Sequence, residues 1–293
     1  MTTTTVTQEL EQIFADAGAT GFLHARAIDG DVEIGLNAGE LAVTASVFKI
    51  PVLVETARQV ASGERSWTDR IRVTPEQHTL GPTGLSVMVD DVDLSLRDLA
   101  YLMMSVSDNT ATDVIMGIVG LDRINATLRE LGLAETHLVG DCQELLSNFT
   151  QDTGLDRLDV NLSTADPQVL SRWRSLDPAQ TSRTTPAEMT HLLKLIWLDQ
   201  AAPAEACAEI RRIMALQVWP HRLTSGFPSG VTLAAKTGTL PGIRNEAGVV
   251  TYPDGSRFAV AVFTRAHSYL DRQPAVDASI GKAAFTAVES LRG

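Results

Sequence analysis

Thr44-Ala45-Ser46-Val47-Phe48-Lys49-Ile50-Pro51 is the stretch from which both the fold and the chemistry of this sequence can be predicted. It places a hydroxyl three residues before an amine, at the expected start of a buried helix. Residues i and i+3 share a helix face, so the Lys49 ammonium can reach the Ser46 oxygen. A serine in the first turn also has a backbone N–H without an intrahelical partner, at the positive end of the helix dipole. The pair therefore predicts a nucleophile beside half of an oxyanion hole.

The scarcity of lysine supports a chemical role for Lys49. The sequence holds four lysines against twenty arginines, so arginine supplies most of its positive charge. Arginine keeps its proton at working pH, whereas a crowded lysine can lose its proton. A lysine retained beside a serine therefore indicates proton transfer. For this pair alone, a solvated helix start in which the two side chains never meet remains the alternative.

Composition and charge exclude several classes of function. The chain has 293 residues, long enough for two layers of core, and its net charge of −12 argues against nucleic acid or an anionic membrane as a partner. No stretch approaches the roughly 20 apolar residues that span a bilayer. Residues 1–10 lack a basic region followed by an apolar run, so we expect a cytoplasmic protein unless a leader has been removed.

The two cysteines, Cys142 and Cys207, lie far apart and show no metal-ligand spacing. Free thiols are expected for both, because a reducing compartment keeps such cysteines unpaired. The sequence therefore predicts neither a metal nor another cofactor.

Hydrophobic spacing and turn residues predict strands at both ends of the chain and helices between them. The expected strands cover residues 20–27, 32–36, 231–236, 246–252 and 258–264, and the expected helices cover residues 6–14, the segment from Ser46, and residues 94–104, 110–119, 121–131, 186–198, 204–216 and 275–291. This order predicts an α/β (α+β) fold in which both ends of the chain share one antiparallel sheet.

The expected sheet lobe contains residues 1–60 and 220–293, and the expected helical lobe contains residues 61–219. A cleft between the two lobes is the natural place for a site. The polar stretch 149–182 is expected to be a long loop, either at the site or on the surface.

Two further motifs follow the first in the chain. Ser107-Asp108-Asn109 by itself would be a helix cap, and Lys236-Thr237-Gly238-Thr239 by itself would be an edge strand in which Gly238 lets a substrate approach the backbone. In the order Ser-x-x-Lys, Ser-Asp-Asn and Lys-Thr-Gly, they form the signature of class A β-lactamases and penicillin-binding proteins. The chain resembles a class A serine β-lactamase-type hydrolase over about residues 20–290. Further segments in that family's order are Leu96-Arg97-Asp98-Leu99, Thr184-Thr185-Pro186-Ala187-Glu188-Met189 and Arg222-Leu223.

The resemblance implies acyl transfer through an ester on Ser46. Lys49, whose ammonium burial and Lys236 would destabilise, could be a neutral general base. Ser107 would relay a proton to the leaving nitrogen. Asn109 would hold a substrate amide oxygen while orienting Lys49.

The resemblance also implies how a substrate would be held. Lys236 and Thr237 would bind a substrate carboxylate, and Arg244 could reinforce them, with a solvated strand arginine as the alternative. The backbone N–H groups of Ser46 and Thr239 would form the oxyanion hole, in which each donor is worth roughly 3 kcal/mol.

The sequence departs from the family at the residue that would activate water. Glu144 has an asparagine four residues later, which is the family's spacing, but lacks the proline and second acid between them. The family's distance from the Ser-Asp-Asn motif, counted from Ser107, places the water-activating acid one or two residues earlier, near Cys142. Asp141 therefore competes with Glu144 for this role. The alternative for Glu144 is an exposed acid at the start of a loop. The stretch after Asn148 is also longer than the family's loop.

The expected function is therefore hydrolysis of a β-lactam or a related amide or ester that carries a carboxylate. The family's protective enzymes and wall-building transpeptidases work outside the cytoplasmic membrane, so an intracellular relative would act on an amide, ester or lactam of metabolic or antibiotic origin. The alternatives are a transferase that passes the acyl group to an amine, and an acyl-binding sensor that does not turn over.

Overall fold

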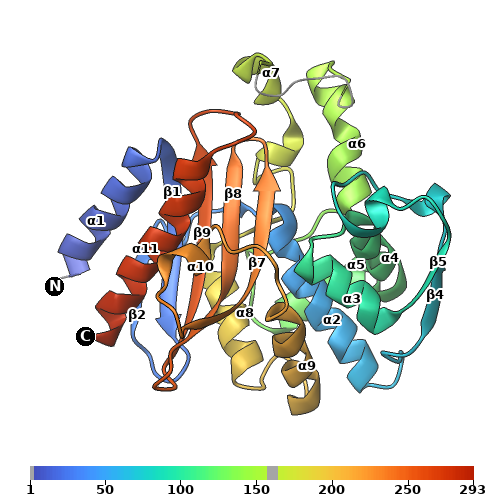
Figure 1. The fold of residues 1–293 in the computed structure, drawn as a ribbon, viewed down its shortest axis with the longest axis horizontal. Coiled ribbons are helices and arrows are strands. Elements are labelled where there is room, and N and C mark those ends of the chain that lie inside the picture. The colour runs from blue at the N-terminus through green and yellow to red at the C-terminus, as the bar shows by residue number, and fades with distance from the viewer. Residues whose placement is uncertain (1–2, 157–163) are drawn as a thin grey trace.

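A computed structural model of the chain describes residues 3–156 and 164–293. Its largest element is a five-stranded antiparallel sheet with the strand order β2-β1-β9-β8-β7 (Figure 1). The strands are β1 (Ala19–Ala27), β2 (Glu33–Leu36), β7 (Thr232–Leu240), β8 (Ile243–Thr251) and β9 (Arg257–Ala266). Leu23 on β1 lies opposite Val262 on β9, so the first and last strands are direct neighbours. The prediction of one sheet shared by both ends of the chain is confirmed.

Helices follow and flank these strands, and those that the sequence predicts occur in the predicted order. They are α1 (Thr3–Asp16), α2 (Lys49–Ala61), α3 (Leu96–Ser105), α4 (Asn109–Val119), α5 (Leu121–Glu130), α6 (Cys142–Thr153), α7 (Pro167–Leu170), α8 (Pro186–Trp197), α9 (Ala204–Met214), α10 (Leu223–Gly226) and α11 (Pro274–Arg292). Two short sheets pair β3 (Ala42–Val43) with β6 (Arg183–Thr184) and β4 (Arg70–Val73) with β5 (Val92–Ser95). Single 3₁₀ turns are η1 (Ala45–Phe48), η2 (Pro75–Gln77), η3 (Gly84–Val87) and η4 (Arg174–Leu176).

Both faces of the sheet are covered, and β9 shows why. Side chains alternate between the faces of a strand. Val260 and Val262 pack into a core with α1 and α11, whereas Ala259, Ala261 and Phe263 pack into the core that contains α2 and α8. A strand buried on both faces reads as an unbroken apolar run, as this one does.

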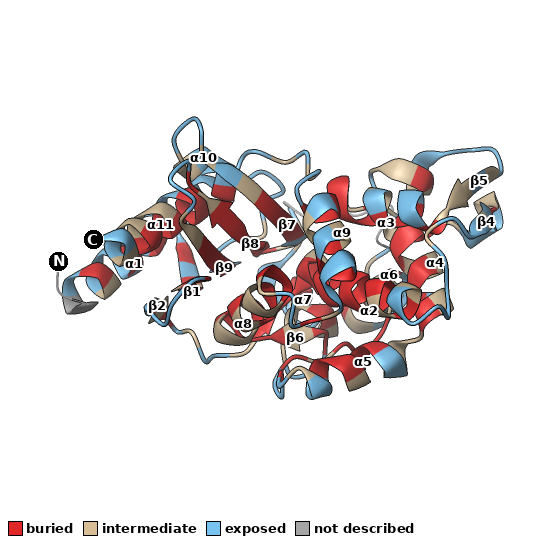
Figure 2. Ribbon diagram, turned by 90° about the horizontal axis from the view of Figure 1, so that it is seen from below, coloured by how far each residue is buried: buried red, intermediate tan, exposed pale blue. Residues whose placement is uncertain are grey.

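Helix α2 lies at the centre of the helical part, and its neighbours α4, α5 and α9 turn buried residues toward it (Figure 2). Pro51 is in its first turn, where a missing backbone N–H costs no intrahelical hydrogen bond. Helix α8 packs against β1, β8 and β9, so it covers the sheet although the sequence assigns it to the helical lobe. The lobe boundaries stay a prediction.

Helix α6 is the longest of the described elements that the sequence prediction missed. Asp141 caps it by accepting the Glu144 N–H, and Gly154 ends it in a left-handed conformation. The loop expected from residue 149 therefore begins five residues later, at Gly154, and carries α7 and η4. Residues 157–163 of that stretch lie outside the described residues. None of the helices in residues 3–156 and 164–293 combines the length and apolar character needed to cross a bilayer.

Candidate active site

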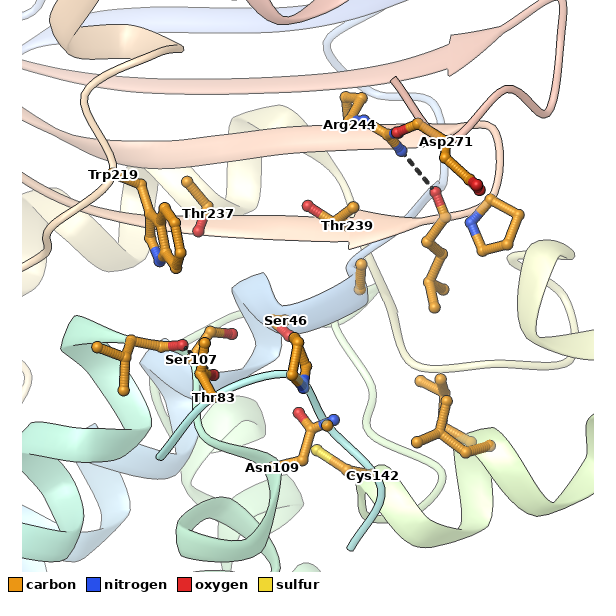
Figure 3. A pocket seen from close by; sticks show the side chains of 18 of the residues that line it. Ser46, Thr83, Ser107, Asn109, Cys142, Trp219, Thr237, Thr239, Arg244 and Asp271 are labelled. Carbon is orange, nitrogen blue, oxygen red and sulfur yellow. Dashed lines mark hydrogen bonds between the residues drawn. The ribbon is translucent and has the colours of Figure 1, made fainter. Parts of the chain in front are cut away.

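A cavity of about 430 Å³ lies where β7 meets the helical part. Ser46 reaches it from η1, Ser107 and Asn109 from the junction of α3 and α4, and Thr237 and Thr239 from β7 (Figure 3). The volume falls in the range of pockets that bury small-molecule ligands. The structure thus brings these five predicted site residues to one cavity, and Arg244 from β8 also lines it.

The backbone at the cavity is strained beside Ser46 and at Ser107. Ala45 has a φ of 44° and Ser107 has a φ of 61°, a left-handed conformation that alanine and serine rarely adopt. Such residues persist only where the surroundings impose them, and they cluster at functional sites. Both of these residues line the cavity.

Gly238 lets β7 approach the nucleophile segment. A Cβ atom built on Gly238 would lie 2.7 Å from the Thr44 carbonyl oxygen. From the neighbouring strand, Asn245 donates to the Val43 and Thr44 carbonyls at 2.8 and 3.2 Å. The close approach that the sequence assigned to a substrate is therefore made by the protein's own backbone.

The Lys49 ammonium is fully buried beneath the cavity, beside Ser107 and Asn109. Its Nζ donates to the Ser107 carbonyl and to Asn109 Oδ1, both at 2.9 Å, and lies 3.3 Å from Ser107 Oγ. Within the described chain no hydrogen bond joins it to Ser46 Oγ. Burial lowers the pKa of Lys49, which favours the neutral amine. A neutral amine has two N–H donors, so it can keep the two carbonyl-type oxygens and turn its lone pair toward a hydroxyl.

The Ser-Asp-Asn motif serves both as a cap and as a cavity wall. The Asp108 carboxylate accepts the backbone N–H of Ala111, as a helix cap does, and also the N–H of Leu85. Asn109 Nδ2 donates to the Leu80 carbonyl, which leaves its oxygen for Lys49. The capping alternative and the expected orientation of Lys49 by Asn109 are therefore both seen.

Lys236 and the edge of β7 form the other side of the site. Lys236 Nζ donates to the Thr237 carbonyl at 2.9 Å, and burial, followed by repulsion from Lys49, holds the pKa of Lys236 well below its usual value. The Thr237 N–H donates to Gln217 Oε1, so it points away from β8. Alternate residues of a strand point their N–H groups to the same side, so the Thr239 N–H points toward the same open edge, where the sequence predicts an oxyanion donor.

Arg222 holds this edge of β7 in place through hydrogen bonds. The sequence analysis placed Arg222 in the family's order of segments but did not predict this role. It is 3% exposed and donates to Asp277, to the Gly238 and Asn245 carbonyls and to Thr239 Oγ1. Because Arg222 supplies a donor to Thr239 Oγ1, that hydroxyl can direct its own proton into the cavity.

Arg244 is placed differently from either sequence expectation. It is buried, and its guanidinium donates to the carbonyls of Leu240, Ile243 and Asp271, with Asp277 3.8 Å from Nε. It is therefore not a solvated strand arginine, although it lines the cavity, and its role toward a substrate carboxylate stays a prediction. Its hydrogen bonds fix the backbone at one end of the cavity.

Glu144 does not line the cavity. Its side chain is exposed on the first turn of α6 and turns back onto Gly140, while Asp141 caps the helix. The helical geometry of α6 instead turns Cys142 into the cavity, close to Asn109 (Figure 3). Burial raises the pKa of the Cys142 thiol, so the thiol stays protonated. The distance from Ser107 in the sequence had pointed to the position that Cys142 occupies. The expectation that Glu144 or Asp141 lies there is wrong, because neither residue lines the cavity.

The cavity contains one carboxylate among its described lining residues, Asp271, which lies at the Arg244 end (Figure 3). The described residues also include no group of three or more His, Cys, Asp or Glu side chains that could hold a metal ion. The cavity is lined by hydroxyls, an amide and a thiol, and the two buried lysine amines lie beside it. These groups suit acyl transfer to serine.

The family model described as the beta-lactamase enzyme family matches residues 5–290. The chain belongs to this family. Its relative from Streptomyces cacaoi, "Beta-lactamase regulatory protein BlaB", is 31% identical over 306 residues and covers 97% of each chain.

Two solved structures show the same fold. The β-lactamase of Sphaerobacter thermophilus is 26% identical, with a TM-score of 0.78 over 99% of this chain and 98% of that chain. A mutant of PBP-A, solved as an acyl-enzyme complex with penicillin-G, is 21% identical, with a TM-score of 0.76 over 98% of this chain and 97% of that chain. The predicted class A β-lactamase-type fold is confirmed.

Proposed function

We propose that this beta-lactamase family member forms an acyl-enzyme on Ser46 with β-lactams or related amides and esters, and that it releases the acyl group slowly. The observation that carries the proposal is the composition of the cavity: the groups for acylation surround Ser46, whereas Cys142 occupies the wall where a water-activating acid was expected. The sequence favoured hydrolysis as the function, whereas this cavity favours an acyl-binding sensor.

Acylation would use groups that the cavity brings together, and it requires Lys49 Nζ to turn from Ser107 and Asn109 toward Ser46 Oγ. Ser46 Oγ attacks the carbonyl carbon, and its proton passes to the neutral Lys49 amine while the oxyanion is held by the N–H groups of Ser46 and Thr239. The C–N or C–O bond then breaks, and Ser107 Oγ–H protonates the leaving atom. Lys49, 3.3 Å from Ser107 Oγ, returns the proton to Ser107, so the amine ends neutral.

Deacylation lacks an evident base. A water that attacks the Ser46 ester must lose a proton, and a positioned general base contributes roughly 10²–10⁴-fold to such a step. Asp113 lies behind Cys142, and its carboxylate already accepts hydrogen bonds from the backbone N–H groups of Cys142 and Gln143 and from Thr79 Oγ1. The Cys142 thiol is held protonated and cannot replace it.

The relatives are compatible with a protein that captures its ligand. The regulatory name of BlaB suits a β-lactam receptor, and the PBP-A mutant was solved as a penicillin-G acyl-enzyme. Hydrolysis is the second candidate, because the Sphaerobacter relative carries the name of a β-lactamase. Transfer of the acyl group to an amine is the third, and added amines would reveal it as a new product.

The test is the mass of the intact protein after mixing with a reporter β-lactam and with an activated ester. We expect one adduct per chain that persists after free ligand is removed, absent in Ser46→Ala and unchanged in Glu144→Gln. No adduct with any acylating probe on a folded sample would refute acylation. Rapid steady turnover that Glu144→Gln abolishes would refute the slow release and restore Glu144 as the base.

A further inference from the structure

We propose that Glu246 and Gln217 are positioning residues for the part of the cavity that would bind a ligand carboxylate. Through Gln217, the buried Glu246 carboxylate holds the backbone of β7 in place. Its negative charge also keeps Lys236 an ammonium. This inference deepens the proposed function and rests on it, because Lys236 and Thr237 are the residues expected to hold the carboxylate of an acyl donor. Neither Glu246 nor Gln217 lines the cavity, so both act through other residues.

Glu246 is a buried carboxylate that the acylation steps do not use. It lies on β8 opposite Thr237 of β7 and is 0% exposed. Its Oε1 accepts Gln217 Nε2 at 2.5 Å, and its Oε2 accepts the Leu223 N–H at 2.7 Å. Within residues 3–156 and 164–293 it forms no ion pair of 4 Å or less. Burial raises the pKa of Glu246, and the two N–H donors, which favour the ionised form, oppose that rise.

Gln217 joins this carboxylate to the outer edge of β7. Its Nε2 donates to Glu246, and its Oε1 accepts the Thr237 N–H at 2.7 Å. An ionised carboxylate only accepts hydrogen bonds and a backbone N–H only donates, whereas a glutamine amide offers both a donor and an acceptor. The charge of Glu246 therefore decides which way the Gln217 amide faces, and only that orientation can hold Thr237.

Both backbone groups of Thr237 are held by side chains of the protein. Its N–H donates to Gln217, and its carbonyl accepts Lys236 Nζ at 2.9 Å. Thr237 itself lines the cavity (Figure 3). Because the Lys236 ammonium rests on the Thr237 carbonyl, a shift of this backbone would also move the ammonium. Gln217 therefore sets the position of both residues that are expected to meet a ligand carboxylate.

The charges around Lys236 are unbalanced without Glu246. Lys236 is 0% exposed, and burial, followed by repulsion from Lys49 and then from Arg222, lowers its pKa, whereas Glu246 raises it. The Cys142 thiol also lies near but stays protonated, so it brings no negative charge. Glu246 is therefore the anion that favours an ammonium at Lys236 while Lys49 becomes neutral.

The first experiment compares penicillin-G with its methyl ester, which lacks the carboxylate, in calorimetric titrations of Ser46→Ala. We expect the acid to bind at least about tenfold more tightly, and added Glu246→Gln to remove most of that preference. Glu55→Gln is the matched control, because Glu55 is also buried and accepts a glutamine Nε2, that of Gln59, away from the cavity. No preference in Ser46→Ala, or equal preference in the two glutamate variants, would overturn the inference.

The second experiment separates the hydrogen bonds from the charge. Gln217→Glu combined with Glu246→Gln keeps each hydrogen bond, because the introduced carboxylate can accept from Thr237 and from the introduced amide. We expect this double variant to recover the preference for the acid, and no recovery would refute the relay through Gln217. If Glu246→Gln does not fold, Gln217→Leu takes its place, and an unchanged preference there would overturn the inference.

The charge of Glu246 is tested by the same titrations from pH 5.5 to 10. Loss of the anion lowers the pKa of Lys236, so in Glu246→Gln the pH at which the preference for the acid is half lost should fall by at least about one unit. An unchanged midpoint would refute the role of the charge.

Intact mass of the unmodified protein with penicillin-G separates this inference from the proposed function. A preference for the acid that depends on Glu246, without an adduct on Ser46, would support the positioning role and refute acylation. An adduct on Ser46, with a preference that Glu246→Gln leaves as Glu55→Gln does, would refute the positioning role and leave the proposed function standing.

Discussion

Replacing Cys142 by glutamate should turn a slow acyl-enzyme into a hydrolase. The side chain lines the same cavity as Ser46, on the wall that bears no carboxylate. A positioned general base is worth roughly 10²–10⁴-fold, and each factor of ten corresponds to about 1.36 kcal/mol, so the barrier to deacylation should fall by about 2.7–5.4 kcal/mol.

The assay follows the decay of the Ser46 adduct by intact mass and the turnover of a reporter β-lactam. Cys142→Gln is the matched control, because it has nearly the same shape and hydrogen-bonding reach but cannot act as a base. Gln143→Glu places a carboxylate one residue further along, on an exposed position outside the cavity. If the Cys142→Glu and Cys142→Gln adducts decay at the same rate, with both variants folded, the missing carboxylate is not what slows release.

Two further predictions concern the nucleophile and its supports. Because burial lowers the pKa of Lys49 and only the neutral amine can accept the Ser46 proton, the acylation rate should rise with pH until the lowered pKa is passed and then level off; stopped-flow rates from pH 5 to 10 test this, and a rate independent of pH would contradict it. Gly238→Ala should destabilise the fold by about 1–3 kcal/mol and slow acylation about 100-fold, since its Cβ would press on the Thr44 carbonyl. Thermal unfolding beside Gly39→Ala, whose Cβ would meet open space, provides the control, and equal behaviour of the two variants would refute the close approach.

Most of the architecture could be predicted from the sequence because it follows from local patterns. The apolar runs of β8 and β9, the turn residues between them and the periodicity of α3, α4 and α8 each depend on nearby residues alone. The motif at Ser46 and Lys49 likewise lies within one helical turn. Helix α6 was missed because its sequence is polar and its stability comes from the Asp141 cap and from contacts with distant Trp173.

The site depended on contacts that no local pattern records. The sequence alone does not distinguish the roles of Arg222 and Arg244. Arg222 donates to the Thr239 hydroxyl, whereas Arg244 donates to the Asp271 carbonyl at the other end of the cavity. Glu144 had the spacing of a base, but two residues along a helix turn a side chain by about 200°, which places Cys142 inward and Glu144 outward.

The sequence by itself determined the Ser46–Lys49 motif, the order of the motifs and the shared sheet, because spacing along a helix or strand fixes which side chains face together. Only the tertiary structure decided which acid, thiol or arginine reaches the cavity. That outcome depends on how α6, β7 and the β9–α11 loop pack against one another, and packing over such distances is set by the whole core rather than by neighbouring residues.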